Sequence, residues 1–420
     1  MNVLLLGSGG REHALAFALA KSPLLDTLFI APGNPGTAEF GDNVVLDIMD
    51  GAAIAAFCKV MGVGFVVIGP EAPLVVGVAD QLAAAGIKVF GPSQAASQLE
   101  GSKTFTKMIC DRAHVPTARY RSFTEAGAAK AYVATEGAPI VVKYDGLMAG
   151  KGVTVAETVA EAQAAIDALY ASEPGARVVI EQCLIGEEAS FFCLVDGETV
   201  LALASAQDHK RAFDGDTGPN TGGMGAYSPA PVMTEAMEAR ALAEIVRPTA
   251  RAMVELGHPY RGVLFVGLMI TAEGPKLIEY NCRFGDPECQ VLVLRLKDDL
   301  LTLLLATVEG ELAHTGVRWK DEVALSVVMA ANGYPGDYAR GSEIKGLEAA
   351  ARLPGVTIFQ AGTRQEGERL LSQGGRVLNI SAVGATVAEA RARAYAAVDA
   401  IDWPGGFCRR DIALRGMAGA

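Results

Sequence analysis

The sequence predicts a multidomain protein of mixed α/β and α+β class, from its length, its core composition and the order of its apolar segments. A chain of 420 residues is long enough for two or three domains with a large core. Half of the residues are hydrophobic but only 6% are aromatic, so we expect an aliphatic core. The pattern of strands and helices changes its character twice along the chain. We therefore expect three domains, at residues 1–101, 102–322 (with a small α+β subdomain at about 123–190) and 323–420.

Strands and helices alternate through the first hundred residues. This alternation is typical of a doubly wound parallel sheet with helices on both faces. The expected strands run into loops rich in glycine or proline, and such sheets bind their ligands at the carboxyl ends of the strands. Strands are expected at residues 3–6, 27–30, 65–68 and 88–90, and helices at 14–21 and 75–85.

The loop Gly7-Ser-Gly-Gly10 after the first strand is similar to a dinucleotide-binding turn but differs from it in two ways. Glu12 stands where the GxGxxG pattern needs its third glycine. The second strand ends at Ala31-Pro-Gly-Asn34, without the acid that holds the ribose of NAD. A helix N-terminus can still bind a phosphate through its N–H groups. We therefore favour a phosphorylated substrate over NAD here, with a ligand-free tight turn as the alternative.

The second region begins at Gly101-Ser-Lys103, with a helix expected over 103–112. Further on, Lys143-Tyr-Asp-Gly-Leu-Met-Ala-Gly-Lys-Gly152 follows an expected strand at 139–142. A glycine-containing loop with an ammonium group at each end suits a triphosphate, although it lacks the GxxxxGK[ST] order of a Walker A loop. The alternative is a surface hairpin with solvated lysines, which a lysine at the end of an apolar strand disfavours.

An apolar strand from residue 178 runs into the polar segment Glu181-Gln-Cys-Leu-Ile-Gly-Glu-Glu188. Backbone groups of Glu181 to Leu184 are placed to pair with a purine edge, and an acid of this segment with ribose hydroxyls. Taken alone, this pattern is equally that of a strand followed by a turn. Its position between other nucleotide-binding patterns favours the functional interpretation.

Charged residues stand beside a run of glycines between Asp208 and Gly225. Asp208-His-Lys-Arg211 is followed by Gly218-Pro-Asn-Thr-Gly-Gly-Met-Gly225. So many glycines indicate a loop that packs against a ligand or closes over it. The alternative is a flexible surface loop.

The segment from Glu279 to Glu288 carries the strongest indication of function. Glu279 and Asn281 stand two residues apart at the end of an apolar strand, so their side chains point to one face. Magnesium prefers oxygen ligands of this kind and usually keeps a nucleotide phosphate as well. Arg283 then offers a guanidinium fork to an anion, and an acidic Asp286-Pro-Glu288 turn follows. The segment predicts a site for ATP and a charged substrate; a strand end with a solvated turn is the alternative.

Beyond residue 323 the pattern indicates a compact α+β domain, with strands at 324–330 and 377–383 and a helix at 387–399. The 36 basic and 48 acidic residues give a net charge of −12, which argues against nucleic-acid or anionic-membrane partners. The seven scattered cysteines contain no CxxC pair, and the histidines show no zinc-binding spacing. The apolar run before Gly7 is too short for a signal peptide or a membrane span. We therefore expect a cytoplasmic protein with reduced thiols.

Taken in this order, the segments resemble the ATP-grasp enzymes, and within them the glycinamide ribonucleotide synthetase (phosphoribosylamine–glycine ligase) family. The matching segments are jointly specific, although each alone is not. They are Gly7 to Ala14, Gly33 to Gly36, Gly69 to Pro73, Gly101 to Lys103, Lys143 to Gly152, Gly186 to Ser190, Gln207 to Arg211, Gly218 to Gly225 and Arg283 to Glu288. The resemblance implies a central ATP-grasp fold whose subdomain 123–190 is a lid, and a monomer whose partners are small molecules.

The resemblance also implies the reaction: ATP, glycine and 5-phosphoribosylamine give glycinamide ribonucleotide, ADP and phosphate through glycyl phosphate, in purine biosynthesis. Glu279 and Asn281 are then the ligands of magnesium or manganese. The implied catalytic residues are Lys143, Lys151 and Arg283. The implied ATP-binding residues are Lys103, Lys143, Lys151, Glu181, Leu184 and Glu188, and the implied substrate-binding residues are Gly9, Gly10, Asn34, Gly36, Glu71, Asp208, Lys210, Arg283 and Asp286.

The chain departs from the family pattern at a few side chains. Tyr144 and Met148 stand where small alanines are usual, Gln182-Cys183 where Glu-Phe is usual, and Cys282 where valine is usual. The strand expected at 262–270 carries no acid, so Glu279 and Asn281 are the only metal ligands that we expect.

Two other classes of function stay open from the sequence. One is another ATP-grasp carboxylate ligase, acting on bicarbonate or formate, which the segments Asp208 to Arg211 and Arg283 to Glu288 disfavour. The other is a nicotinamide-dependent oxidoreductase or a non-catalytic nucleotide sensor. The interrupted glycine pattern disfavours the oxidoreductase, and the lysines with the Glu279–Asn281 pair disfavour the sensor.

Overall fold

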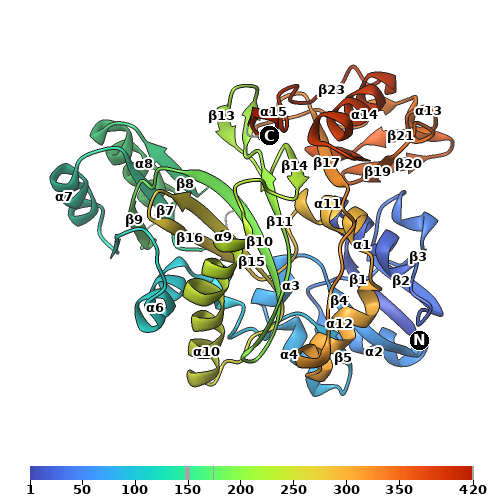
Figure 1. Ribbon diagram of the computed structural model, residues 1–420, viewed down its shortest axis with the longest axis horizontal. Helices are drawn as coiled ribbons and strands as arrows, with labels where there is room; N and C mark the ends of the chain where they lie inside the picture. Colours follow the sequence, from blue (N-terminus) through green and yellow to red (C-terminus); the bar gives the residue numbers. More distant parts are fainter. Residues whose placement is uncertain (147–151, 174, 419–420) are drawn as a thin grey trace.

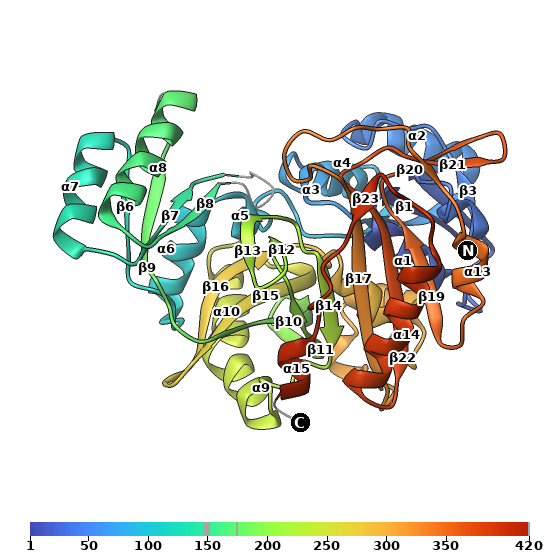
Figure 2. The ribbon, with the colours of Figure 1, turned by 90° about the horizontal axis from the view of Figure 1, so that it is seen from above.

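The structure of the chain is a computed structural model that describes residues 1–146, 152–173 and 175–418 (Figure 1). The N-terminal and C-terminal regions lie together at one end of the molecule, and a small subdomain stands off at the other end (Figures 1 and 2). No helix within the described ranges is long and apolar enough to cross a membrane.

The N-terminal region is the predicted doubly wound parallel sheet, with strand order β3-β2-β1-β4-β5. Alternate residues of β1 pack into two different cores: Val3 and Leu5 into one, Leu4 and Leu6 into the other. Burial on both faces explains why this strand is a continuous apolar run rather than an alternating one. The elements are β1 (Asn2–Gly7), α1 (Gly10–Leu19), β2 (Thr27–Pro32), β3 (Asp42–Asn43), α2 (Gly51–Met61), β4 (Val63–Ile68), α3 (Glu71–Val75), α4 (Val78–Ala84) and β5 (Lys88–Phe90).

Two boundaries differ from the sequence prediction. Helix α1 begins at Gly10, directly after the glycine loop, and not at residue 14. The helix expected over 75–85 is two helices, because Gly77 adopts the left-handed conformation (φ 87°) between α3 and α4. Glycine takes this conformation without steric cost.

The small subdomain is an antiparallel sheet of order β6-β9-β7-β8, covered on one face by two helices. It has a separate apolar core, centred on Val142, Ile166 and Ile180. Helix α6 and the short helix α5 lead into it from the first region. The bounds are α5 (Gln98–Gly101), α6 (Lys103–Ala113), β6 (Tyr120–Phe123), α7 (Ala126–Glu136), β7 (Ile140–Tyr144), β8 (Val153–Ala156), α8 (Val159–Ser172) and β9 (Val178–Gln182).

The middle and C-terminal regions share one nine-stranded sheet, of order β16-β15-β10-β11-β14-β17-β22-β19 with β23 beside β17. The link between the two regions is the antiparallel pair of β14 and β17, in which Gly225 lies opposite Val327. The glycine-rich segment expected as a loop therefore contains a short hairpin (β12 and β13) and a strand of the main sheet. The strands of the large sheet and of the separate β12–β13 hairpin are β10 (Glu187–Asp196), β11 (Thr199–Asp208), β12 (Arg211–Phe213), β13 (Thr217–Asn220), β14 (Gly225–Ser228), β15 (Arg261–Thr271), β16 (Gly274–Asn281), β17 (Val323–Ala331), β19 (Val356–Gln360), β22 (Arg376–Gly384) and β23 (Gly406–Phe407).

Helix α11 lies at the centre of the molecule, and all eight of its residues are buried. It contacts α1 of the N-terminal region and the strands β11, β14 and β17 of the large sheet. Its aliphatic run 291–294 is expected to be enclosed in this way, and Glu288, Gln290 and Arg295 are buried with it. The remaining elements are α9 (Glu235–Ala241), a π-helical turn (Leu242–Val246), α10 (Arg247–Glu255), α11 (Glu288–Arg295), α12 (Leu300–Glu309), β18 (Glu343–Ile344), α13 (Leu347–Ala351), β20 (Thr363–Glu366), β21 (Arg369–Ser372), α14 (Val387–Ala400) and α15 (Leu414–Ala418), with short 3₁₀ turns at Thr37–Glu39 and Leu312–His314.

Candidate functional site

Most of the predicted site residues lie where the end of β16 meets the small subdomain, helix α6 and the loop after β1. Glu279 and Asn281 are the last polar residues of β16, and both are half-buried. Burial raises the pKa of Glu279, but Lys210, Lys143 and Lys103 together bring it below its ordinary value. The Glu279 side chain is therefore ionised at neutral pH and lies in a field of lysine charges.

One carboxylate and one amide oxygen on the same strand face fit a hard divalent cation that takes its other ligands from phosphate and water. Within the described residues, no group of three or more histidine, cysteine or acidic side chains is placed to bind a metal by itself. The donor set therefore suits magnesium held jointly with a nucleotide, and not a metal site made of protein alone.

Two lysines share the carboxylate of Glu181. Lys143 Nζ lies 3.0 Å from Glu181 Oε2, and Lys107 Nζ lies 3.3 Å from the same oxygen. All three side chains are buried. The carboxylate of Glu181 thus pairs with two lysines. Its backbone role remains a prediction.

Lys107 is a site residue that the sequence analysis missed. It follows Lys103 by four residues on α6, so both ammonium groups lie on one face of the helix. That spacing places Lys107 beside Lys103 on α6, but the sequence alone does not show that Lys107 pairs with Glu181. The tertiary structure provides that position, because β9 runs beside β7.

Asp145, directly after β7, binds the start of α6. Its carboxylate accepts hydrogen bonds from Ser102 Oγ (3.1 Å), from Thr104 N–H (3.2 Å) and from Thr104 Oγ1 (2.5 Å). Lys103 Nζ donates to the carbonyl of the next residue, Gly146 (3.0 Å). A carboxylate at a helix N-terminus is favourable because it meets unpaired N–H groups. These contacts fix the first half of the predicted phosphate loop to α6.

Three other predicted ATP-binding residues have different outcomes. Lys151, and with it Met148, lies outside the described residues. Leu184 lies in the connection between β9 and β10, which links the two sheets. Glu188 forms an ion pair with Lys210 (3.1 Å). The roles of these residues in binding ATP stay predictions.

Arg283 was predicted to clamp an anion, but every edge of its guanidinium group has a protein partner. Nε donates to Glu71 (3.1 Å), Nη1 to the Phe284 carbonyl (3.2 Å), and Nη2 lies 3.5 Å from Glu100. The two carboxylates raise the pKa of Arg283 despite its burial. Protein groups thus hold the guanidinium of Arg283 in this structure, and its role toward an anion stays a prediction; the sequence offered no indication of Glu100 as a partner.

The two acids that hold Arg283 differ in their protonation. Burial raises the pKa of Glu100 to about 7, because Arg283 only partly offsets the loss of water. Arg283 and Arg11 lower the pKa of Glu71 to about 2. Two carboxyl groups with such different pKa values are typical of a functional site.

A cavity of about 240 Å³ opens at the start of α1, between the N-terminal and C-terminal regions. Its lining comes from the β1 loop, the Asp286 turn and three C-terminal loops: Ser8, Gly9, Asp286, Tyr334, Ala361, Gly362 and Arg376. Arg376 donates to the Asp286 and Gly222 carbonyls (2.5 and 2.9 Å). Of the predicted substrate-binding residues, Gly9 and Asp286 line this cavity.

Gly10, Asn34 and Gly36 do not line it. The Asn34 amide donates to the Ser8 carbonyl (2.8 Å) and the Gln360 carbonyl (2.9 Å), and its oxygen accepts from Gly36 N–H (2.8 Å). A Cβ on Gly10 would lie 2.2 Å from the Asn379 amide. These contacts pack the N-terminal region against the C-terminal one, and the role of Gly10, Asn34 and Gly36 in holding the phosphoribosyl part of the substrate stays a prediction.

Asp208 and Lys210 form a turn at the end of β11, opposite the start of α11. Burial raises the pKa of Asp208. Lys210 has a pKa well above its ordinary value, because Glu188, Asp208 and Glu279 outweigh the effect of burial. Burial and Asp208 raise the pKa of the neighbouring Glu288 to about 7. Acidic side chains thus surround the ammonium group of Lys210 at this turn.

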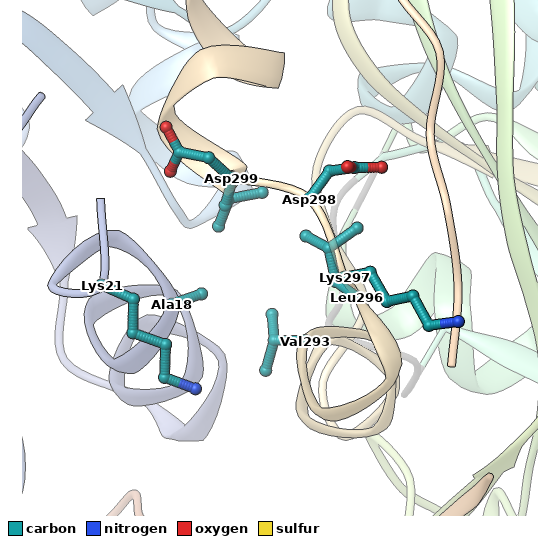
Figure 3. A pocket seen from close by; sticks show the side chains of 8 residues that line it. Ala18, Lys21, Val293, Leu296, Lys297, Asp298 and Asp299 are labelled. Carbon is teal, nitrogen blue, oxygen red and sulfur yellow. The ribbon is translucent and has the colours of Figure 1, made fainter. Parts of the chain in front are cut away.

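A second cavity, of about 200 Å³, lies between α1 and the junction of α11 and α12 (Figure 3). Its acids already have partners: Asp298 binds Arg318 (2.9 Å to Nε), and Asp299 caps α12. None of the predicted site residues lines this cavity. It contributes nothing to the site described above.

Three comparisons bear on the chain. Profiles of the phosphoribosylglycinamide synthetase N domain, ATP-grasp (A) domain and C domain match residues 1–100, 101–289 and 324–415. A phosphoribosylamine–glycine ligase of Mesorhizobium japonicum is 62% identical over 421 residues, covering 100% of this chain and 99% of that protein.

Two solved structures are also similar. The crystal structure of phosphoribosylamine–glycine ligase from Thermotoga maritima has a TM-score of 0.84 at 31% identity, covering 98% of this chain and 100% of that one. The biotin carboxylase domain of 2-oxoglutarate carboxylase from Hydrogenobacter thermophilus, in complex with the magnesium salt of ADP, has a TM-score of 0.73 at 16% identity, covering 97% and 91%. The second likeness shows a shared fold alone.

Proposed function

The chain belongs to the phosphoribosylglycinamide synthetase family of ATP-grasp enzymes, with the activity of a phosphoribosylamine–glycine ligase of purine biosynthesis. On this basis we propose which residues bind each substrate and which serve the phosphoryl transfer. The reaction joins glycine to 5-phosphoribosylamine and converts ATP to ADP and phosphate. In the first step a glycine carboxylate oxygen attacks the γ-phosphorus, and ADP leaves. In the second step the amine of phosphoribosylamine attacks the carbonyl of glycyl phosphate, phosphate leaves, and the nitrogen loses one proton.

Phosphoryl transfer is catalysed mainly by positioning and charge neutralisation. Lys103 and Lys143 supply that charge beside the β16 carboxylate, and Lys151 completes the set in our proposal. The buried contact with Glu181 fixes the direction of the Lys143 ammonium group (3.0 Å). Lys107, on the same carboxylate, supports this arrangement.

Glu279 and Asn281 hold magnesium, or manganese, in the proposed site. A cation held by Glu279 and Asn281 would supply charge neutralisation to the phosphates. The ionised state of Glu279, maintained by three lysines, supports this assignment.

The cavity at the start of α1 takes the phosphoribosyl part of the second substrate. It is lined by Ser8 and Gly9 at the N-terminus of α1 and by Arg376. An arginine fork and a helix N-terminus both favour a phosphate. Glu71 and Arg283 support the wall beneath this cavity through Arg11, whose Nη1 shares the Phe284 carbonyl with Arg283.

Glycine binds at the turn of Asp208 and Lys210, between the nucleotide and the cavity. An ammonium ion such as that of Lys210 suits the glycine carboxylate, and the half-buried acids Asp208 and Asp286 suit its amino group. The small subdomain closes over the nucleotide and keeps water from the acyl phosphate, since water would hydrolyse that intermediate.

The arrangement corresponds to domains at 1–101, 102–322 and 323–420, and the ranges of the three family profiles support these boundaries. We propose that the enzyme acts as a monomer, which light scattering after size exclusion tests. We also propose a cytoplasmic location, which the scattered cysteines without a CxxC pair support.

The single observation that carries this proposal is the convergence of Glu279, Lys143 and Lys103 beside the Asp208–Lys210 turn. The test is ADP release with magnesium, ATP, glycine and phosphoribosylamine made in place from ribose 5-phosphate and ammonia. We expect release only when both substrates are present. Release that ignores glycine, or that proceeds with bicarbonate or formate instead, would contradict the proposal.

A further inference from the structure

A buried arginine near the C-terminus holds the hairpin that follows the Asp208–Lys210 turn. Only 1% of Arg409 is exposed. Its Nη1 donates to Asp216 (2.9 Å) and to the Arg211 carbonyl (3.0 Å), both in the β12–β13 hairpin. Its other edge donates twice to Asp411 (2.7 Å each). A buried guanidinium with both edges paired is a strong geometric constraint on the groups around it.

The same segment makes further contacts with the hairpin. Asp411 accepts from the backbone N–H of Gly215 (2.8 Å), and Asp214 accepts from that of Arg410 (2.7 Å). Arg415 forms an ion pair with Asp216 (2.6 Å). Residues 409–415, here called the C-terminal clamp, therefore hold a hairpin that lies about two hundred positions earlier in the chain. Figures 1 and 2 show α15 beside this part of the main sheet.

The hairpin is continuous with the turn that faces the site. The carbonyl of Lys210 accepts from Thr221 N–H (2.7 Å) and from Thr221 Oγ1 (2.8 Å), across the base of the hairpin. His209, between Asp208 and Lys210, is buried, and its Nε2 accepts from Ala413 N–H (3.3 Å). The clamp thus touches the turn from behind as well as through the hairpin.

His209 connects the turn to the C-terminal clamp, because its Nε2 accepts from Ala413 N–H. The flanking Asp208 and Lys210 instead lie near Glu188 and Glu279 of the site. The hairpin carries Asp214 and Asp216, and the clamp carries Arg409, Arg410 and Arg415, so their charges are complementary.

We propose that the C-terminal clamp positions the Asp208–Lys210 turn for glycine, with Arg409 as a positioning residue that acts through the hairpin and through His209. This inference rests on the glycine role of the turn in the proposed function. It gives the C-terminal region a part in catalysis besides lining the phosphoribosyl cavity. A displacement of about 1 Å at a reacting group lowers turnover by up to about a hundredfold, so even a small shift of the turn is measurable.

The experiment compares the full-length enzyme with Arg409→Lys and with Asp216→Asn. Asp216 lies in the exposed hairpin, so its change leaves the C-terminal core intact if Arg409→Lys does not fold. The matched control is Asp399→Asn, which removes the ion pair of Asp399 with Arg410 (2.6 Å) without touching the hairpin. Lys210→Ala is measured in parallel.

Two readouts separate positioning from general stability: the KM for glycine against that for ATP, and amide hydrogen exchange in peptides covering 205–225. We expect both clamp variants to raise the glycine KM about tenfold and to speed exchange in these peptides, with the ATP KM unchanged. The control is expected to match the wild type in both. Clamp variants that only lower the melting temperature, or that raise the KM values of glycine and ATP alike, would overturn the inference.

The Lys210→Ala variant distinguishes a failure of the proposed glycine site from a failure of the C-terminal clamp. If Lys210→Ala leaves the glycine KM unchanged, the glycine role of the turn fails, and the exchange data alone then decide whether the clamp holds the turn. Unchanged exchange in both clamp variants overturns the clamp whatever the kinetics of Lys210→Ala.

Discussion

Asp145 offers the sharpest test of how the small subdomain serves the reaction. Its carboxylate accepts three hydrogen bonds from Ser102 and Thr104, and these tie the end of β7 to the start of α6. Lys103, between those two residues, depends on the same arrangement through the Gly146 carbonyl. Replacing Asp145 by Ala removes all three hydrogen bonds without changing a lysine.

The expected magnitude follows from those contacts. A hydrogen bond to a charged group contributes about 1.5–3 kcal/mol, and because Asp145 is only half-buried we take about 1 kcal/mol for each. Three such bonds favour the docked arrangement by about 3 kcal/mol, which is about a hundredfold in population. We therefore expect Asp145→Ala to lower kcat/KM for ATP by about ten- to a hundredfold, depending on how far bound ATP restores the docked state.

The assay measures ADP release and glycinamide ribonucleotide formation in the same samples. Besides the loss in kcat/KM, we expect fewer product molecules per ADP, because a loosely docked subdomain admits water to the acyl phosphate. The control is Glu173→Ala, which removes the exposed hydrogen bond of Tyr144 to Glu173 (2.6 Å) in the same subdomain. An Asp145→Ala enzyme within threefold of the wild type in kcat/KM, with unchanged coupling, would refute the reasoning.

Four further outcomes are expected. Lys151→Ala is expected to lower turnover by about a hundredfold or more, as the loss of one electrostatic stabiliser does, and a rate near that of the wild type would remove it from the mechanism. Glu279→Gln is expected to raise the magnesium concentration needed for half-maximal rate; an unchanged titration would contradict the metal assignment. Arg376→Ala is expected to raise the KM for phosphoribosylamine about tenfold or more while the KM for ATP stays constant, and equal changes in both would argue for a structural role instead. Because the pKa of Glu100 rises from 4.5 in the unfolded chain to about 7 in the folded one, its favourable contribution to stability is present below pH 4.5 and lost as the pH rises through 7. Urea unfolding of Glu100→Gln is therefore expected to lack that decline, and parallel pH profiles for the two proteins would contradict the pKa shift.

The sequence by itself determined the features that depend on local geometry. The apolar runs and glycine loops predicted the parallel sheet, because strand and loop propensities are properties of short segments. The spacing of Glu279 and Asn281 was enough to place both side chains on one strand face, because side chains alternate along any strand. The joint order of the motifs was enough to indicate the family.

Only the tertiary structure decided which charged groups pair with one another. Arg283 was expected to bind an anion, yet it lies between Glu71 and Glu100, which are 212 and 183 positions away in the chain. Asn34 was expected to contact substrate, and its amide donates to the carbonyl of Gln360 in the C-terminal region. A side chain's type tells what it can bind, but its partner depends on which distant segments the packing of the core brings within about 3 Å, and that distance is a property of the whole fold.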